Sequence, residues 1–337
     1  MSVLVTGGLG YIGSHTVVEL INQGYDVVVV DNLSNSKIEI VEQIRKITGK
    51  QIKFYICDLC DKPMLSKVFE QNKDIEDVIH FAGLKAVGES CQKPLMYYEN
   101  NIMSTINLLK VMIENGVKNL IFSSSATVYG NPKRVPIVET DDVGGTTNPY
   151  GTTKVVIEGI LKDVFKTHPE MNIALLRYFN PIGAHPSGLI GESPNGIPNN
   201  LMPYITQVAI GKRERLNVFG NDYDTPDGTG VRDYIHVVDL ALGHIATMKK
   251  LHSGSGLVVY NLGTSKGTSV LELIKAFEKA TGVEIPYAIA PRRAGDIAEC
   301  YADCSKAERE LGWTAKRTIE NACCDSWKWQ LYSKDLK

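Results

Sequence analysis

Tyr150 and Lys154 stand four residues apart in the segment 148–154, and this pair could move a proton. On a helix the two side chains share one face, with the ammonium group beside the phenol oxygen. Asn148 is a good N-cap and Pro149 a good first helical residue, so Tyr150 would lie in the first turn, where the helix dipole favours negative charge. The dipole and the ammonium group should both lower the pKa of the phenol from its ordinary value of about 10. Tyr150 is therefore a candidate proton acceptor, although a surface tyrosine beside a solvated lysine would show the same spacing.

A hydroxyl group for the same site comes from the run of serines at 123–125. This run follows a predicted strand over residues 119–122, so it lies at the carboxyl end of that strand. Such a run is usually a polar loop. Combined with Tyr150 and Lys154, however, Ser125 could hydrogen-bond both the phenol and a substrate alcohol, which predicts Ser125, Tyr150 and Lys154 as the catalytic residues.

A glycine-rich turn near the start of the chain is typical of dinucleotide binding. A buried strand at 2–6 leads into Gly7, Gly10 and Gly13, and a helical pattern follows over 14–22. Glycines at these spacings let the backbone approach a pyrophosphate at a helix N-terminus. A second strand at 25–30 ends in Asp31, whose carboxylate could accept hydrogen bonds from the adenosine ribose and would repel a 2'-phosphate. The pattern favours NAD over NADP.

Strands and helices then alternate, as in a parallel sheet covered on both faces. Further predicted helices are 37–48, 63–71, 94–115, one that starts at 149–150, 271–281 and 305–311, and further predicted strands are 52–56 and 77–81. The helix that starts at 94 and the helix that starts near Tyr150 should be neighbours. The predicted fold is α/β: a doubly wound parallel Rossmann-type sheet with a smaller mixed α/β substrate domain.

Composition narrows the class of protein. The chain has 337 residues, 43% of them hydrophobic, and 36 basic against 38 acidic residues give a net charge of -2. This balance argues against a nucleic-acid partner and favours small-molecule chemistry. The first apolar run begins at Val3 and no stretch approaches the length of a membrane span, so we expect a cytosolic protein.

No metal site is expected. Seven cysteines are an odd number, and Cys57 and Cys60 have no second pair at ligand spacing. His185 and His236 have no second ligand at helical spacing, so core or loop roles are expected for them.

Several long motifs resemble one family closely. The chain resembles the UDP-glucose (UDP-galactose) 4-epimerases of the extended short-chain dehydrogenase/reductase family from Val3 to about Trp329. The motifs that carry the resemblance are residues 5–16, 80–90, 122–130, 176–181, 183–188, 196–204 and 228–236.

The resemblance implies an NAD-binding domain over 1–179, a nucleotide-sugar domain over 180–337 with some segments returning to the first sheet, and a homodimer through the helices near Pro94 and Tyr150. It assigns to NAD Gly7, Gly10, Tyr11, Ile12, Gly13, Asp31, Asn32, Asn35, Ser36, Asp58, Leu59, Phe81, Ala82, Gly83, Lys85, Asn100, Tyr150, Lys154 and Phe179. It assigns to a UDP-hexose substrate Lys85, Ser125, Tyr150, Asn180, Asn200, Leu201, Asn217, Val218, Phe219, Arg232, Arg293, Asp296 and Cys300.

Within this family, the residue four beyond the ribose-binding aspartate is implied to control sugar choice. Counting from Asp296 gives Cys300, where a tyrosine would fill the space of an N-acetyl group. The resemblance therefore implies 4-epimerisation of UDP-galactose and UDP-glucose through a 4-ketose, and also of their N-acetylated counterparts. A local shift of one residue would instead place Tyr301 in the pocket.

Two other functions are compatible with parts of the pattern. A nucleotide-sugar 4,6-dehydratase would need an acid pair beside the triad hydroxyl, where this chain has Ala126 and Thr127. A dinucleotide-sensing module without catalysis would not need Ser125, Tyr150 and Lys154 together.

Overall fold

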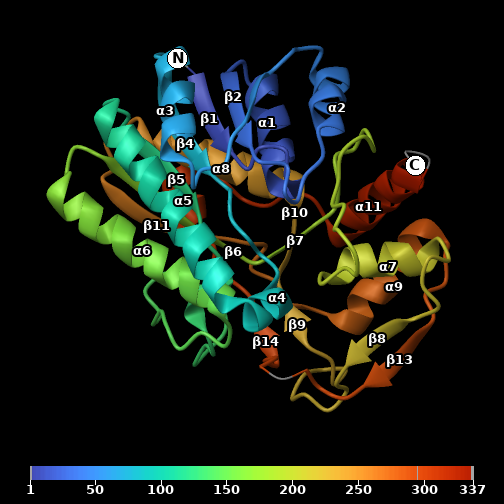
Figure 1. Cartoon of the computed structure of the whole chain (residues 1–337). Helices are drawn as coiled ribbons and strands as arrows, with labels where there is room; N and C mark the ends of the chain where they lie inside the picture. Colours follow the sequence, from blue (N-terminus) through green and yellow to red (C-terminus); the bar gives the residue numbers. More distant parts are fainter. Residues whose placement is uncertain (1, 294, 335–337) are drawn as a thin grey trace.

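A seven-stranded sheet forms the centre of the computed structural model, which describes residues 2–293 and 295–334 (Figure 1). Its strand order is β11-β6-β5-β4-β1-β2-β3, and every neighbouring pair is parallel. The strands are β1 (Ser2–Thr6), β2 (Asp26–Asp31), β3 (Lys53–Ile56), β4 (Ile75–His80), β5 (Asn119–Ser123), β6 (Asn172–Tyr178) and β11 (Leu257–Leu262). The predicted doubly wound parallel sheet is confirmed.

The apolar residues of the central strands alternate between two cores because both faces of the sheet are covered. In β1, Val3 and Val5 contribute to one core and Leu4 to the other; in β2, Val29 joins the first and Val28 the second. Nearly continuous runs of valine and leucine therefore form these strands.

Helices cover each face. The first core is closed by α1 (Tyr11–Asn22), α2 (Glu39–Thr48) and α8 (Val237–Leu251), and the second by α3 (Lys62–Gln71), α5 (Pro94–Glu114) and α6 (Pro149–Thr167). As predicted, α5 and α6 pack against each other. In Figure 1 they lie side by side along one flank of the sheet.

The remaining elements form a smaller mixed α/β region at the carboxyl ends of the strands (Figure 1). Its short strands pair as β7 (Asn180–Ile182) with β10 (Tyr234–His236), β8 (Leu216–Phe219) with β13 (Tyr287–Ala290), and β9 (Val231–Arg232) with β12 (Thr268–Ser269) and β14 (Glu299–Cys300). Its helices are α7 (Leu201–Ala209), α9 (Val270–Thr281) and α11 (Ile319–Lys334). Helix α10 (Ser305–Leu311) instead packs on α8 and the edge strand β11, and α4 (Val87–Gln92) and the 3₁₀ turn η1 (Ala126–Tyr129) also lie nearer the sheet. A third core joins α7, α9 and α11.

Two elements from the second half of the chain complete the first sheet. Strand β11 pairs with β6 at one edge, and α8 packs against α1. Neither element was predicted as such from its residue pattern. The border at residues 179 and 180 stays a prediction.

Most predicted boundaries agree with the structure to within one or two residues. The first helix is the exception, since it begins at Tyr11 rather than at residue 14, so Tyr11 and Ile12 belong to its first turn. In residues 2–293 and 295–334, no helix is both long enough and apolar enough to cross a bilayer.

Candidate active site

The N-terminus of α6 positions the predicted catalytic pair. Asn148 caps the helix, its Oδ1 accepting from the Gly151 N–H at 2.9 Å, and Pro149 is the first helical residue. Tyr150 then lies in the first turn and Lys154 one turn later, with exposed fractions of 9% and 6%. The predicted cap and helix start are confirmed.

The prediction that the pKa of Tyr150 is lowered is wrong. Burial raises the pKa of Tyr150 to about 12, and a hydrogen bond from Ser125 offsets only part of the rise. The ammonium group does not contact the phenol oxygen: Lys154 Nζ donates to the Ser123 carbonyl at 2.7 Å and lies 5.8 Å from the centre of the Tyr150 ring. Removal from water outweighs the helix dipole, because desolvation disfavours the phenolate.

The pKa of Lys154 shifts in the opposite direction. Burial lowers its pKa to about 8, and the negative charge of Glu158 on the next turn opposes this effect. The lysine is therefore poised to lose its proton just above neutral pH.

The three consecutive serines have different partners. The Ser123 hydroxyl bonds the hydroxyl of Tyr178, and Ser124 Oγ donates to Glu158 Oε1 at 2.7 Å. Ser125 Oγ caps η1 by accepting from the backbone and hydroxyl of Thr127 at 3.2 and 3.0 Å. Ser125 is the serine that acts on the Tyr150 phenol.

The glycine turn leaves no room for side chains. A Cβ on Gly13 would lie 2.2 Å from the Gly7 carbonyl oxygen, and a Cβ on Gly7, whose φ is +66°, would lie 2.8 Å from the Ala82 nitrogen. Gly10, at the α1 N-cap, provides no side-chain cap, and the first turn contains no acidic residue. The turn therefore offers free N–H groups to an anion at close range, as a pyrophosphate site requires.

Polar residues at the ends of β2 and β3 form one cluster. Asp31 is buried, and its carboxylate accepts from the Leu9 N–H at 3.1 Å and the Ser36 hydroxyl at 2.7 Å. Asn32 Nδ2 donates to Asp58 Oδ2 at 3.2 Å. Leu59 is buried in the second core, and Asn35 Oδ1 accepts from the Asn195 side chain at 3.3 Å.

The segment after β4 continues along the same sheet edge. The Phe81 ring lies 4.7 Å from that of His244. Gly83 has a φ of +155°, and a Cβ there would meet Asn101 Oδ1 at 3.2 Å. That same Asn101 oxygen accepts from Asn100 Nδ2 at 3.0 Å.

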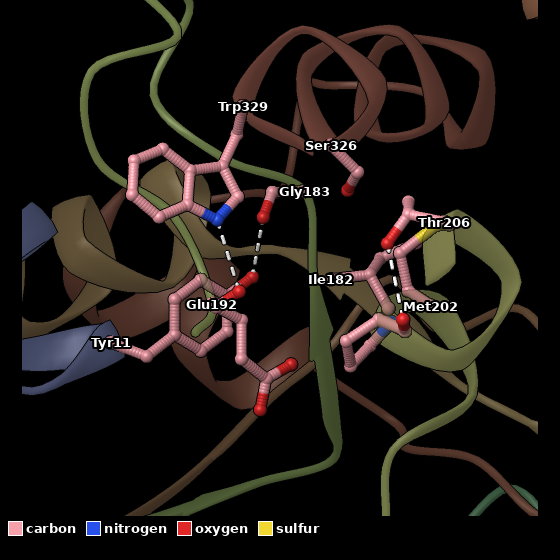
Figure 2. Close-up of a pocket in the computed structure, with 9 residues that line it drawn as sticks. Tyr11, Ile182, Gly183, Glu192, Met202, Thr206, Ser326 and Trp329 are labelled. Atoms are coloured by element: carbon pink, nitrogen blue, oxygen red, sulfur yellow. Dashed lines mark hydrogen bonds between the residues drawn. The ribbon is translucent and has the colours of Figure 1, made fainter. Parts of the chain in front are cut away.

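A carboxylate that the sequence did not single out connects two of the predicted ligand-binding residues. Glu192 Oε1 lies 3.3 Å from Lys85 Nζ and accepts from Asn200 Nδ2 at 2.7 Å. Figure 2 shows Glu192 beside Tyr11, whose hydroxyl donates to the Gly183 carbonyl at 2.7 Å. The ion pair joins the first sheet to the smaller region next to the glycine turn.

Two predicted phosphate-binding arginines share one carboxylate. Asp296 accepts from Arg293 Nε at 2.9 Å and lies 3.6 Å from Arg232 Nη2. The Arg293 guanidinium stacks 4.9 Å from the centre of the Phe219 ring. Cys300 pairs with Arg232 in the β9–β14 ladder. The predicted diphosphate, ribose and sugar-choice residues are therefore gathered in one place.

The other predicted substrate residues lie on neighbouring elements. Asn180 is the first residue of β7, its N–H bonded to the Asp233 carbonyl at 3.0 Å, and Leu201 is the first of α7. On β8, Val218 is buried while Asn217 and Phe219 are exposed. Phe179 is buried in a small cluster under η1.

Among the described residues, no three histidine, cysteine or acidic side chains lie where they could share a metal ion. His236 instead caps α8, its Nδ1 accepting from the Val238 N–H at 3.1 Å. His185 Nδ1 lies 2.8 Å from the Ser187 hydroxyl.

Sequence reasoning missed four residues of this site: Thr127, Glu158, Tyr178 and Glu192. Only Glu158 had a usable signal, since it stands four residues after Lys154 and so shares its helix face. Thr127 bonds Ser125 two residues away, but the bonds of Tyr178 to Ser123 and of Glu192 to Lys85 join segments that are distant in the chain.

Known proteins resemble this chain over its full length. The model of the family described as GDP-mannose 4,6 dehydratase matches residues 4–325. The UDP-glucose 4-epimerases of Haemophilus influenzae and Bacillus subtilis are 60% and 61% identical, each over 98% of this chain and 97% of theirs.

Two solved structures have the same fold. UDP-glucose 4-epimerase from Bifidobacterium longum in complex with NAD+ and UDP has a TM-score of 0.95 at 58% identity, covering 99% of both chains. The enzyme from Stenotrophomonas maltophila, with bound NAD and formylated UDP-arabinopyranose, has a TM-score of 0.98 at 51% identity over 100% of both. With full-length identities this high and this arrangement of Tyr150, Lys154 and Ser125, the chain belongs to the UDP-glucose 4-epimerases of the extended short-chain dehydrogenase/reductase family.

Proposed function

We propose that the protein is an NAD-dependent 4-epimerase that interconverts UDP-galactose and UDP-glucose. The observation that carries the proposal is the joint burial of Ser125, Tyr150 and Lys154 at the carboxyl edge of the sheet that holds the glycine turn. Ligands of open α/β sheets bind at this edge. The Haemophilus influenzae and Bacillus subtilis relatives, at 60% and 61% identity, are UDP-glucose 4-epimerases.

The residues present fit NAD. Because Gly13 has no Cβ, it can pack against the Gly7 carbonyl oxygen, and the first turn of α1 stays accessible to a pyrophosphate. A Cβ on Gly13 would collide with that oxygen and disrupt the turn. Asp31 ends β2 with a carboxylate suited to ribose hydroxyls and unsuited to a 2'-phosphate. Lys154 would hydrogen-bond the cofactor ribose as well as stabilise the phenolate.

The protein side chains would handle the proton. Tyr150 would take the proton of the sugar 4-hydroxyl, and Ser125 would hydrogen-bond the same oxygen. When bound, NAD+ supplies the acceptor for the C4 hydride, returns that hydride later, and adds a positive charge to the site. Because burial raises the pKa of Tyr150 to about 12 without the cofactor, that additional charge would favour the phenolate form.

Epimerisation follows from the geometry of the 4-ketose. Its C4 would be planar, so a sugar that turned about its pyrophosphate link would present the opposite face of C4 to the same site. The reaction has no net redox change, and the cofactor need not leave between turnovers.

Elimination of water, the reaction named for the matching family model, lacks its residues here. A 4,6-dehydratase needs a general acid and base beside the triad hydroxyl. Those positions are Ala126 and Thr127, and Thr127 is hydrogen-bonded to Ser125.

We propose that the cluster of Arg232, Arg293 and Asp296 binds the UDP moiety. Guanidinium groups suit two phosphate oxygens, and the Asp296 carboxylate suits ribose hydroxyls. Asn217, Val218 and Phe219 would lie along the uracil, and Asn180, Asn200 and Leu201 around the sugar nucleotide.

Cys300 supports acceptance of N-acetylated sugars as well. Its pairing with Arg232 in the β9–β14 ladder brings it beside the proposed diphosphate site. Tyr301 instead lies against Gly267, a Cβ on which would meet the Tyr301 ring at 3.2 Å. A thiol at Cys300 leaves space for an acetamido group that a phenol ring would fill.

We further propose a homodimer through α5 and α6. Leu95 and Met103 on α5 and Val156 on α6 are exposed apolar residues of these packed helices. Light scattering should give twice the chain mass, and Met103→Glu with Val156→Glu should give the monomer mass. Leu331→Glu, on an exposed leucine of α11, is the control; a wild-type monomer would contradict the proposal.

The cytosol is the compartment we propose. The seven cysteines are free thiols in the structure, as suits a reducing compartment.

The test of the function is an assay of purified protein without added reductant. We expect bound NAD, interconversion of UDP-galactose and UDP-glucose, and a loss of roughly 10²- to 10⁴-fold in kcat for Tyr150→Phe. A substantial rate in this variant would overturn Tyr150 as the base, and inactive wild-type protein with NAD bound would favour a sensing module.

A further inference from the structure

A buried ion pair lies directly beneath the serine segment 123–125. Arg177 Nε and Nη2 donate to Glu158 Oε1 and Oε2 at 2.9 and 2.6 Å. Both side chains are 2% exposed. The Oε1 atom also accepts from Ser124 Oγ at 2.7 Å. Glu158 takes no part in the proposed proton transfer.

Glu158 contacts the catalytic segment from the side opposite to the reaction. The backbone of Ser125 is extended, and the hydroxyl groups of Ser124 and Ser125 have different partners. Ser124 is bonded to Glu158, and Ser125 faces Tyr150. Fixing the Ser124 side chain therefore fixes the direction of the Ser125 hydroxyl.

The ion pair is itself held by surrounding groups. Arg177 Nη1 donates to the Tyr129 hydroxyl and to the Glu139 carbonyl, both at 3.1 Å. The Tyr129 hydroxyl donates to Asn261 Oδ1 at 2.6 Å. A buried pair whose hydrogen bonds are all satisfied adds little net stability but defines geometry sharply. Here it ties α6, β6, η1 and β11 to the end of β5.

We propose that Glu158 is a positioning residue of the epimerase: it orients Ser125 through Ser124, and it supplies the negative charge that faces Lys154 one turn away on α6. The inference rests on the proposed function, because it assigns a role within that reaction.

Glu158 is the acidic side chain that faces Lys154 from the next turn of α6, and it shares its carboxylate with Arg177 and Lys162. Tyr150 and Glu158 face it from α6, His80 from β4, and Tyr178 lies behind Tyr150 on β6. Burial lowers the pKa of His80 to about 3, so this histidine is neutral at working pH. Burial also raises the pKa of Tyr150, so without the cofactor the phenol is neutral and adds no negative charge beside Lys154.

Ser124→Ala tests the orientation of Ser125 without disturbing the ion pair. We expect kcat for UDP-galactose to fall about tenfold with KM changed less than about twofold, because the hydroxyl is misplaced while the UDP contacts are intact. A wild-type kcat in this variant would overturn the positioning of Ser125.

Glu158→Gln tests the charge. Without the carboxylate the pKa of Lys154 should fall further below about 8, so the upper pH limit of kcat should move down by roughly half a unit or more. A purely structural role would lower kcat equally at every pH. If the upper pH limit of kcat did not move, the proposed effect of the Glu158 charge on Lys154 would be overturned. If Glu158→Gln does not fold, Ser124→Ala decides the proposal.

Lys162→Met is the matched control. Lys162 Nζ lies 3.7 Å from Glu158 Oε2 but is 39% exposed and does not contact the serine segment. We expect wild-type kcat and pH limit in this variant. Inactive wild-type protein would overturn the proposed function instead, which separates the two failures.

Discussion

Tyr150 and Lys154 are both buried, and burial shifts their pKa values in opposite directions. Burial raises the pKa of the Tyr150 phenol to about 12 and lowers the pKa of the Lys154 ammonium group to about 8. Their spacing on a helix could be read from the sequence, but their removal from water could not, because it depends on β5, β6 and α5 packing around them. The same limit applies to Glu192, whose partner Lys85 lies 107 residues away in the chain.

At Cys300, we predict that substitution by tyrosine changes sugar choice alone. Cys300→Tyr should abolish epimerisation of UDP-N-acetylglucosamine and retain that of UDP-glucose, because the ring would occupy the acetamido space. Rates on both substrates, measured side by side, check this expectation.

Cys300→Ser is the matched control and should keep both activities, because it preserves the small size of the side chain. Equal losses on both sugars in Cys300→Tyr would show that the residue does not control substrate choice.

At the scale of elements, the strands and helices up to α6 could be predicted well because each carries a strong local signal. β1 and β2 are apolar runs, α6 begins at an Asn-Pro cap, and the glycine turn joins β1 to α1. Strand β11 and helix α8 have ordinary apolar patterns. Nothing local shows that they return to the first sheet, since pairing with β6 is decided by the rest of the fold.

The β1–α1 turn gives a prediction about a single methyl group. Gly13→Ala should lower the free energy of unfolding by roughly 1–3 kcal/mol and release NAD, because the new Cβ meets the Gly7 carbonyl oxygen at 2.2 Å. Thermal unfolding and the absorbance of retained NAD measure the two effects.

Gly159→Ala on α6 is the matched control, since a Cβ there meets nothing within 4 Å. Alanine in an open helical position should be neutral or stabilising by up to about 1 kcal/mol. If Gly13→Ala behaved in the same way, the close packing of the glycine turn would be wrong.

For the whole molecule, buried histidines should govern acid stability. Burial lowers the pKa of His15, His80 and His244 to about 3, 3 and 4, from an ordinary value of 6.5. Nε2 of His15 and of His244 has no hydrogen-bond partner, so a proton there would be a buried unpaired charge. The unfolded chain binds these protons below pH 6.5 and the folded chain does not, so stability is present above 6.5 and lost as pH falls toward 4.

The slope of the unfolding free energy against pH reports how many more protons the unfolded chain binds than the folded chain. Between pH 4 and 6.5, we expect this difference to be smaller by about one proton in His244→Phe. Urea titrations at several pH values measure this slope independently of any overall change in stability. An equal slope in His244→Phe and wild type would contradict the assignment.

The return of β11 and α8 to the first sheet has a consequence for synthesis on the ribosome. A nascent chain that has reached residue 179 already contains the glycine turn and all three catalytic side chains. Its sheet would nevertheless end at β6, whose outer backbone groups have no partner until β11 emerges, and α1 would lack the cover of α8. Open apolar edges of this kind invite pairing with other chains. The N-terminal half is therefore expected to depend on chaperones until translation has passed residue 262, and a messenger RNA truncated earlier would yield an aggregating fragment rather than a free cofactor-binding domain.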